Sequence, residues 1–126
     1  MIFVIKGNEF MSKRPLFKLS ARLRLCADFV SEGSRIADVG TDHGYLPIWL
    51  AKKNKIKHAI AADLREDPLR SAQNNIKKYR VDKIVETRFS DGLSNILPEE
   101  IDEIIIAGMG GELIAQIIEN TSWLSE

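Results

Sequence analysis

Apolar residues recur along the chain with two spacings, one typical of helices and the other of buried strands. A stripe repeating every three or four residues predicts a first helix, and it is formed by Leu19, Leu23, Cys26 and Val30. Ser20 would cap this helix and Gly33 would end it. Because Cys26 lies on the stripe, we expect it in the core rather than acting as a nucleophile.

Four short apolar runs predict strands over residues 35–40, 57–63, 84–89 and 103–107. The last run, EIIIA, is typical of a strand that is buried on both faces. Helical patterns occupy residues 45–54, 67–80 and 112–120. Asp67 is expected to cap the second of these, ahead of Pro68. The third should face the core through Leu113, Ile114, Ile117 and Ile118.

This alternation of strands and helices predicts an α/β fold with about four parallel strands and right-handed crossovers. Residues 1–18 are expected to form a lead-in, with Met11 as an alternative start, and residues 19–126 to form the domain. In such folds ligands bind at the carboxyl ends of the strands. Candidate chemistry should therefore follow each strand.

Composition narrows the class of protein. The 126 residues are 44% hydrophobic and 29% charged, which suits one globular domain. They contain no apolar run long enough to span a bilayer and no secretory leader pattern, so we expect a cytoplasmic protein without membrane contact. The single cysteine excludes an internal disulfide framework and a multi-cysteine zinc site, and no metal is expected.

Charge is unevenly distributed, although the formal net charge is zero. Residues 1–80 carry sixteen Lys and Arg against eight Asp and Glu, whereas residues 81–126 carry two against ten. A basic first half is compatible with a polyanionic partner, and equally with charges that decorate solvated faces.

Three strand ends carry candidate binding residues. After the first strand, Gly40 and Gly44 would let the backbone approach a ligand, as they would in a generic turn. Asp63 ends the second strand and could accept both hydroxyls of a ribose, or could serve the turn. Asp91 and Gly92 follow the third strand, where they could bind the edge of an adenine or form an ordinary Asp-Gly turn.

Together these strand ends predict a site for a cofactor that contains adenosine. A dinucleotide is disfavoured because the chain has G-x-x-x-G where the dinucleotide fingerprint has G-x-G-x-x-G. Asp38 and Asp42 flank the loop and would repel a pyrophosphate. They would attract the sulfonium and ammonium groups of S-adenosylmethionine.

The segments IADVGTDHGYLP, AADL, SDGL and AGMGG resemble class I S-adenosylmethionine-dependent methyltransferases, which have a Rossmann-like fold. LSARL, DVGTDHGYLP and IIIAGMGGELI resemble more closely the bacterial tRNA (adenine-22-N1)-methyltransferase family, over residues 19–120. The resemblance implies S-adenosyl-L-methionine as cofactor and tRNA, around adenine 22, as partner. It also implies methylation of N1 of that adenine.

By the same resemblance, Asp38, Gly40 and Gly44 would surround the methionine part of the cofactor. Asp63 would hold the ribose, Leu64 would lie against the adenine face, and Asp91 with Gly92 would bind the adenine edge. Gly108–Gly111 stands where amino-methylating relatives carry an (Asp/Asn)-Pro-Pro-(Tyr/Phe) motif, and Gly108 would line the cofactor site. The residues implied for this cofactor are Asp38, Gly40, Gly44, Asp63, Leu64, Asp91, Gly92 and Gly108.

No catalytic base is assigned, since N1 of a neutral adenine has a free lone pair and methyl transfer needs chiefly position and electrostatics. Candidates for contact with the target base are Asp42, His43, Tyr45 and Met109. His43 could equally be structural, and Met109 could simply fill space. His58 is expected to be structural.

The resembled family continues beyond the region matched here, so the chain is expected to be a truncated cofactor-binding portion. One sheet edge would then expose Ile104–Ile106 and favour self-association. Two alternatives remain at this point. The chain could be a methyltransferase for another RNA or a small molecule, or a non-catalytic fragment that binds S-adenosylmethionine.

Overall fold

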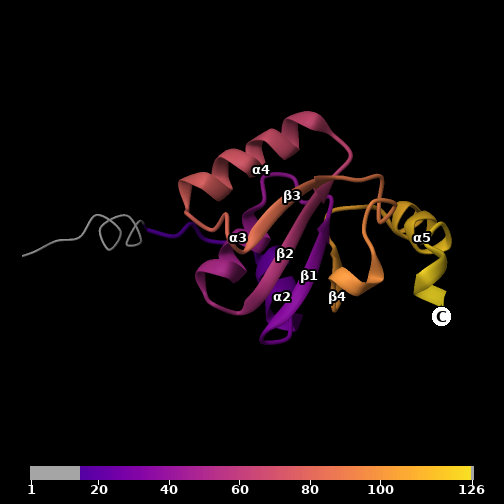
Figure 1. Ribbon diagram of the computed structural model, residues 1–126, viewed down its shortest axis with the longest axis horizontal. Helices are drawn as coiled ribbons and strands as arrows, with labels where there is room; N and C mark the ends of the chain where they lie inside the picture. Colours follow the sequence, from indigo (N-terminus) through magenta and orange to yellow (C-terminus); the bar gives the residue numbers. More distant parts are fainter. Residues whose placement is uncertain (1–14, 126) are drawn as a thin grey trace, which may run out of the picture.

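The computed structural model describes residues 15–125, which form one parallel sheet covered by helices (Figure 1). The sheet order is β3-β2-β1-β4, and this confirms the predicted α/β fold. Its strands are β1 (Ser34–Val39), β2 (Ile56–Asp63), β3 (Val85–Phe89) and β4 (Glu103–Ile106). The helices are α2 (Ala21–Phe29), α3 (Tyr45–Lys52), α4 (Glu66–Lys78) and α5 (Gly111–Glu119), with short 3₁₀ turns η1 (Pro98–Glu100) and η2 (Ser122–Ser125).

The strand register brings the carboxyl ends of the strands to one edge of the sheet. Val39, the last residue of β1, pairs with Ala62 of β2 on one side and with Ile106 of β4 on the other. Asp63 at the end of β2 pairs with Phe89 at the end of β3. The loops that follow all four strands therefore start side by side.

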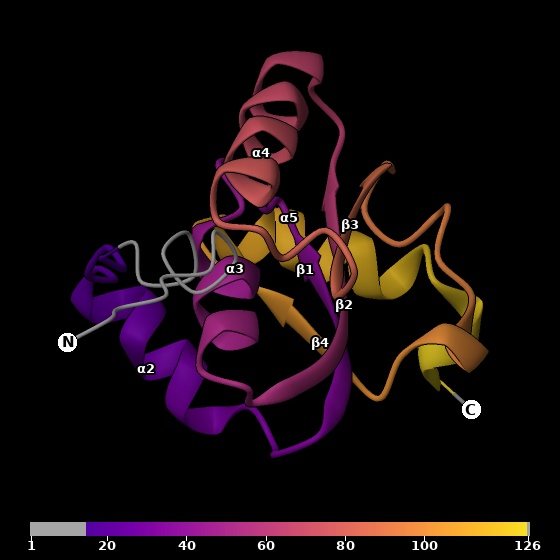
Figure 2. The ribbon, with the colours of Figure 1, turned by 60° about the vertical axis from the view of Figure 1, so that its left-hand side comes forward.

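Two hydrophobic clusters cover the two faces of the sheet. Alternate side chains of a strand point to opposite faces, so Ile36 and Ala37 enter different clusters. The first cluster joins the sheet to α2, α3 and α4. The second joins it to α5 and to the connection between β3 and β4. In Figure 2, α5 accordingly lies on the opposite side of the sheet from α3.

Helix α2 forms where its apolar stripe predicts it but ends earlier than expected. The Ser20 hydroxyl caps it by accepting a hydrogen bond from the N–H of Leu23 at 3.3 Å. The helix stops at Phe29, and Gly33 lies in the following turn with a φ of +73°. Gly33 donates its N–H to the Lys55 carbonyl at 2.7 Å, so this glycine shapes the entry to β1 rather than the helix end. Cys26 packs against the first cluster, as predicted.

The prediction that Asp67 caps α4 is wrong. The helix begins at Glu66 with Arg65 at the capping position, so Asp67 and Pro68 both lie inside the first turn. Proline is tolerated there because the first N–H groups of a helix have no partner within the helix. The acids of the first turn and the lysines of the last turn, Glu66, Asp67, Lys77 and Lys78, complement the helix dipole.

Two predictions of burial are corrected near the end of the chain. All four residues of β4 are only partly buried, because β4 is the last strand of the described sheet and pairs on one side only. In α5, Ile117 is buried, but Leu113 and Ile118 are 48% and 51% exposed. This helix therefore meets the second cluster along a narrower stripe than its sequence suggests.

His58 is held by Glu86 at 2.9 Å between neighbouring strands, in keeping with a structural role. None of the helices among residues 15–125 has the length and hydropathy needed to cross a bilayer. Met11 and most of the predicted lead-in lie outside the described residues.

Candidate functional site at the carboxyl edge of the sheet

The loop after β1 turns sharply and is tied to the end of β2. Gly40 has a φ of +74°, a conformation that favours glycine, and Asp42 adopts φ +58°. The N–H groups of Gly40 and Thr41 both donate to the Ala62 carbonyl at 2.9 Å. The N–H of Asp42 donates to Oδ2 of Asp63 at 3.2 Å, so the first loop helps to orient the acid of the second strand.

A cleft of about 430 Å³ opens where these loops meet, and we call it the main cleft. It runs from the turn after β1, across the ends of β2 and β3, to the glycine turn before α5. Its lining is formed by Val39, Gly40, Asp63, Leu64, Arg65, Ser90, Asp91, Gly92, Gly108, Met109, Gly110, Leu113 and Ile117. Asp63 and Asp91, which come from different strand ends, therefore face one shared cavity.

A second cavity of about 190 Å³ adjoins the main cleft, and we call it the acidic hollow. Asp38 and Asp42 line it, together with Arg22, Thr41, His43 and Tyr45. Gly40, Arg65, Gly108 and Met109 line both cavities. The two cavities are thus neighbours, and a ligand lying across Gly40 would reach acids in both.

Asp63 is buried, at 3% exposure, yet its carboxylate is well supplied with donors. Oδ1 accepts the backbone N–H of Arg65 at 3.0 Å and the Arg65 Nε–H at 3.2 Å. Burial raises the pKa of this carboxyl, but the hydrogen bonds from Arg65 and from the Asp42 N–H outweigh burial and leave the pKa lowered. Asp63 is therefore an anion whose carboxylate oxygens can accept hydrogen bonds from a ligand.

Asp38 is buried at the end of β1 in a different environment. The Thr41 hydroxyl donates to its Oδ2 at 2.8 Å. Burial raises its pKa to about 6, and the negative charge of Asp63 adds to the rise against the Thr41 hydrogen bond. A bound cation would relieve this unfavourable burial of charge.

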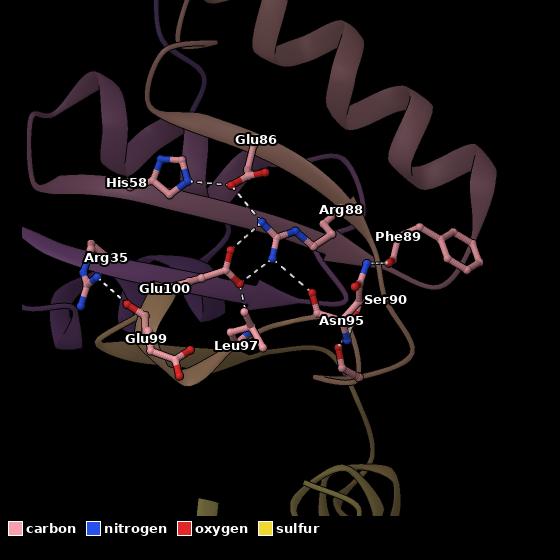
Figure 3. Close-up of polar contacts among 11 residues, drawn as sticks. Arg35, His58, Glu86, Arg88, Phe89, Ser90, Asn95, Leu97, Glu99 and Glu100 are labelled. Carbon is pink, nitrogen blue, oxygen red and sulfur yellow. Dashed lines mark hydrogen bonds and ion pairs between the residues drawn. The ribbon is translucent and has the colours of Figure 1, made fainter. Parts of the chain in front are cut away.

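A polar network joins β3 to the connection that carries Asp91 (Figure 3). Arg88 donates to both carboxylate oxygens of Glu100, at 2.6 and 3.0 Å, and to the Asn95 carbonyl at 3.1 Å. The Ser90 hydroxyl donates to the Gly92 carbonyl at 2.8 Å and accepts the Asn95 N–H at 3.1 Å. These hydrogen bonds hold the turn that carries Asp91 and Gly92, and both residues line the main cleft.

Backbone conformation and close packing explain why glycine occurs at positions 92 and 44. Both have positive φ, of +59° and +76°, and a Cβ on Gly92 would meet Ile117 at 3.1 Å. A Cβ on Gly44 would meet Ala72 of α4, also at 3.1 Å, and Gly44 lines neither cavity. The close approach of α3 and α4 accounts for the glycine at this position, and its predicted contact with a cofactor stays a prediction.

The candidates for substrate contact cluster beside the acidic hollow. The Nδ1 atom of His43 lies 2.7 Å from the Ser71 hydroxyl, and its ring centroid is 5.4 Å from that of Tyr45. Tyr45 is 40% exposed at the start of α3. The Met109 side chain reaches across to Gly40, where an added Cβ would lie 2.5 Å from its Cε.

Polar residues that were not among the predicted site residues also line the two cavities. Arg65 folds back onto Asp63, Thr41 supplies the hydroxyl for Asp38, and Arg22 of α2 comes close to Gly108. Only the Asp-x-x-Thr spacing of residues 38–41 offered a local signal, since it suits a turn hydrogen bond. The Arg65–Asp63 contact spans two residues and depends on the turn before α4, whereas the approach of Arg22 to Gly108 joins segments far apart in sequence. Within residues 15–125, no three His, Cys, Asp or Glu side chains come together as a metal site requires.

The parallel sheet in the order 3-2-1-4, the glycine turn after β1 and the acids after β2 and β3 define a Rossmann-like domain of the class that binds nucleoside cofactors. Residues 19–126 match the family described as methyltransferase domain, and the chain belongs to this family.

Similar proteins include two curated enzymes and a solved structure. The tRNA (adenine(22)-N(1))-methyltransferase of Bacillus subtilis is 41% identical over 102 residues, which cover 81% of this chain and 43% of that enzyme. The ribosomal protein L11 methyltransferase of Listeria innocua is 32% identical, covering 73% of this chain and 29% of that enzyme. M. capricolum TrmK, solved with S-adenosyl-homocysteine, has a TM-score of 0.77 and 39% identity, covering 81% of this chain and 46% of that chain. The chain thus spans less than half the length of these relatives.

Proposed function

We propose that this chain is the cofactor-binding portion of a tRNA methyltransferase that methylates N1 of adenine 22. The proposal rests on the family to which the chain belongs and on its likeness to the Bacillus subtilis enzyme over most of its length. S-adenosyl-L-methionine is the cofactor we assign to the joined cavities. Because both tRNA and this cofactor occur in the cytoplasm, we also propose a cytoplasmic location.

The observation that carries the proposal is the convergence of Asp38, Asp63 and Asp91 on adjoining cavities around Gly40. The adenosine of the cofactor would occupy the main cleft, where Asp63 accepts the ribose hydroxyls and Asp91 with Gly92 meets the adenine edge. Leu64, which is 51% exposed in this cleft, offers an apolar surface for the adenine face.

The methionine part would then enter the acidic hollow. Asp38 is buried there with a raised pKa of about 6, so a positively charged group nearby favours its ionised form. Gly40 has no side chain, and the flexible Met109 side chain that lies over its backbone would move aside to let a ligand cross from one cavity to the other. When bound, the cofactor would supply an activated methyl group on a positively charged sulfur.

Methyl transfer in this site needs positioning more than proton transfer. The N1 lone pair of the target adenine would form the new N–C bond as the S–C bond breaks, and the positive charge would pass to the adenine ring. Asp42, at the rim of the acidic hollow, would stabilise that charge, while His43 and Tyr45 would hold the ring. Because N1 takes part in base pairing, the adenine must be unpaired or extruded from its stack first.

A direct test is calorimetric titration of the chain with S-adenosylmethionine, comparing wild type with Asp63→Ala. We expect the variant to lose at least about tenfold in affinity, because it removes charge-assisted hydrogen bonds. Asp67→Ala is the matched control, since Asp67 is a nearby aspartate whose side chain is 92% exposed outside the cleft. Equal affinity in all three proteins would remove Asp63 from the site.

A second candidate function is methyl transfer to another substrate. It is favoured by the ribosomal protein L11 methyltransferase match, because enzymes with different substrates share this region. The two candidate functions are separated by measuring transfer of a labelled methyl group to tRNA. Transfer to tRNA with adenine 22 is compared with transfer to the same tRNA substituted at that position. Cofactor binding without transfer to any saturating tRNA would instead indicate a non-catalytic fragment.

A further inference from the structure

A third cavity, of about 450 Å³, lies between the last turn of α4 and the segment that leads into α2. We call it the aromatic pocket. Three rings line it, and those of Tyr45 and Tyr79 lie 4.9 and 5.2 Å from the Phe17 ring, centroid to centroid. Lys18 and Lys78 complete its rim. Neither cavity of the proposed cofactor site contains such a cluster of rings.

The aromatic pocket adjoins the acidic hollow. Tyr45 and Leu23 line both cavities, so a chain that leaves the acidic hollow past Tyr45 enters the aromatic pocket directly. The His43 ring, 5.4 Å from that of Tyr45, lies on the same path. A polymeric substrate whose reacting unit occupies the acidic hollow would thus place a neighbouring unit here.

The charge of the aromatic pocket suits a nucleotide. Among the described residues that line it, none is acidic, and two are lysines. The Nζ of Lys78 lies 5.5 Å from the centre of the Tyr79 ring, so a cation and a stacking surface are presented together. Aromatic rings that stack bases beside lysines that meet phosphates are the usual means of holding single-stranded nucleic acid.

The cofactor itself fits the aromatic pocket poorly. A ribose needs acceptors for its hydroxyls, and the carboxylates that could accept them, Asp63 and Asp91, lie in the main cleft. We propose that the aromatic pocket receives an unpaired nucleotide next to the target adenine, its base against Tyr79 and Phe17 and its phosphate near Lys18 and Lys78. This inference rests on the proposed function, because it takes the substrate to be RNA.

The test compares the binding of a tRNA transcript to two matched pairs of variants. Tyr79→Leu removes the ring but keeps apolar volume, whereas Tyr79→Phe keeps the ring. We expect Tyr79→Leu to weaken tRNA binding by about tenfold, the usual effect of removing one stacking ring, and Tyr79→Phe to bind as wild type. S-adenosylmethionine affinity, measured by calorimetry without RNA, should be the same in all three.

The second pair tests the interaction with phosphate. Lys78→Gln should reduce the slope of log affinity against log salt concentration by about one, as expected when a single lysine no longer neutralises a phosphate. Lys77→Gln is the control, since Lys77 is the adjacent lysine of α4 and does not line the pocket. If Tyr79→Leu does not fold, the comparison of Lys78→Gln with Lys77→Gln still tests whether the aromatic pocket binds RNA.

The outcomes separate this inference from the proposed function. If wild type binds cofactor and methylates tRNA while Tyr79→Leu and Lys78→Gln bind tRNA as wild type does, the aromatic pocket is not an RNA site. If Tyr79→Leu weakens cofactor binding in the absence of RNA, the pocket belongs to the cofactor and the inference is overturned. If wild type neither binds cofactor nor methylates tRNA, the proposed function itself fails.

Discussion

The side chain of Met109 lies over the bare backbone of Gly40, so that a methyl group added at Gly40 would be 2.5 Å from the Met109 Cε. Both residues line the main cleft and the acidic hollow. Met109 therefore sits at the junction that a ligand spanning the two cavities must cross, and its flexible side chain can move aside.

Gly40→Ala should impair the chain in two separable ways. The φ of +74° costs an alanine about 1–2 kcal/mol, which should appear as a lower free energy of unfolding in denaturant titrations. The added methyl also displaces Met109 and should weaken S-adenosylmethionine binding. In the double variant Gly40→Ala/Met109→Ala, we expect cofactor affinity to recover in part while stability stays low. A single variant as stable as wild type would contradict the backbone argument.

Arg65 contacts the Asp63 carboxylate that we propose for the cofactor, and we expect the two to compete for it. Its guanidinium contacts both oxygens, at 3.2 and 3.4 Å, while the backbone N–H groups of Asp42 and Arg65 hold the carboxylate in place. Arg65→Met should thus keep or raise the affinity for S-adenosylmethionine, measured by calorimetry, whereas Asp63→Asn should lower it. An equal loss in both variants would show instead that the arginine itself holds the cofactor.

Asp38 should make stability and cofactor binding respond to pH in opposite senses. Its pKa is raised from 3.8 to about 6 in the folded chain, so the unfolded chain loses this proton first as pH rises. The stabilisation from this group is complete below about pH 4 and is lost as pH rises through about 6, a change on the order of 3 kcal/mol. Attraction for a cationic cofactor should grow over the same window, because Asp38 becomes an anion.

Asp38→Asn separates the contribution of Asp38 to the pH dependence of stability from that of other carboxyls. The carboxyls whose pKa is lowered are Asp63, Glu100, Asp102 and Glu103. The asparagine oxygen can still accept the Thr41 hydroxyl. We expect the variant to gain stability relative to wild type as pH rises from about 4 to 7, and to bind S-adenosylmethionine more weakly at the upper end. A difference in stability that does not vary with pH would show that Asp38 keeps an ordinary pKa.

The architecture of the site follows from local sequence patterns, but its detailed contacts do not. Apolar runs and the parallel topology were enough to predict that Asp63 and Asp91 face one edge of the sheet, because the ends of parallel strands meet there. The turn at Arg65 could not be predicted, since α4 begins before the cap expected at Asp67. The contact of Met109 with Gly40 joins loops far apart in sequence and has no local signal.

The sequence also could not predict how deeply β4 and α5 are buried. The run at residues 104–106 is as apolar as a central strand, but burial depends on how many neighbours a strand has. Within the described sheet β4 has one neighbour, so its side chains stay partly exposed. In the same way, Leu113 is half exposed where it lines the main cleft, which periodicity does not reveal.

The Arg88 network should control the order of the turn that bears Asp91. Arg88→Gln leaves Glu100 and Glu86 without their shared partner and frees the Asn95 carbonyl. We expect faster hydrogen exchange at the amides of residues 94–96 and weaker cofactor binding, with exchange in β2 unchanged. Arg70→Gln is the control, because Arg70 forms exposed pairs along α4. Unchanged exchange at residues 94–96 would mean that the turn holds its shape without Arg88.

The outer edge of β4 should promote self-association of the chain. No strand within residues 15–125 pairs with this edge, and a groove of about 360 Å³ runs along it, lined by Cys26, Phe29, Val30 and residues 103–106. Phe29 is 78% exposed there, so Phe29→Glu should leave the core intact while placing charge on the groove. Sedimentation velocity at micromolar concentration should then show a shift from dimer to monomer. Leu97→Glu, at a leucine 62% exposed away from this groove, should leave association unchanged. A folded monomeric wild type under these conditions would rule out association through β4.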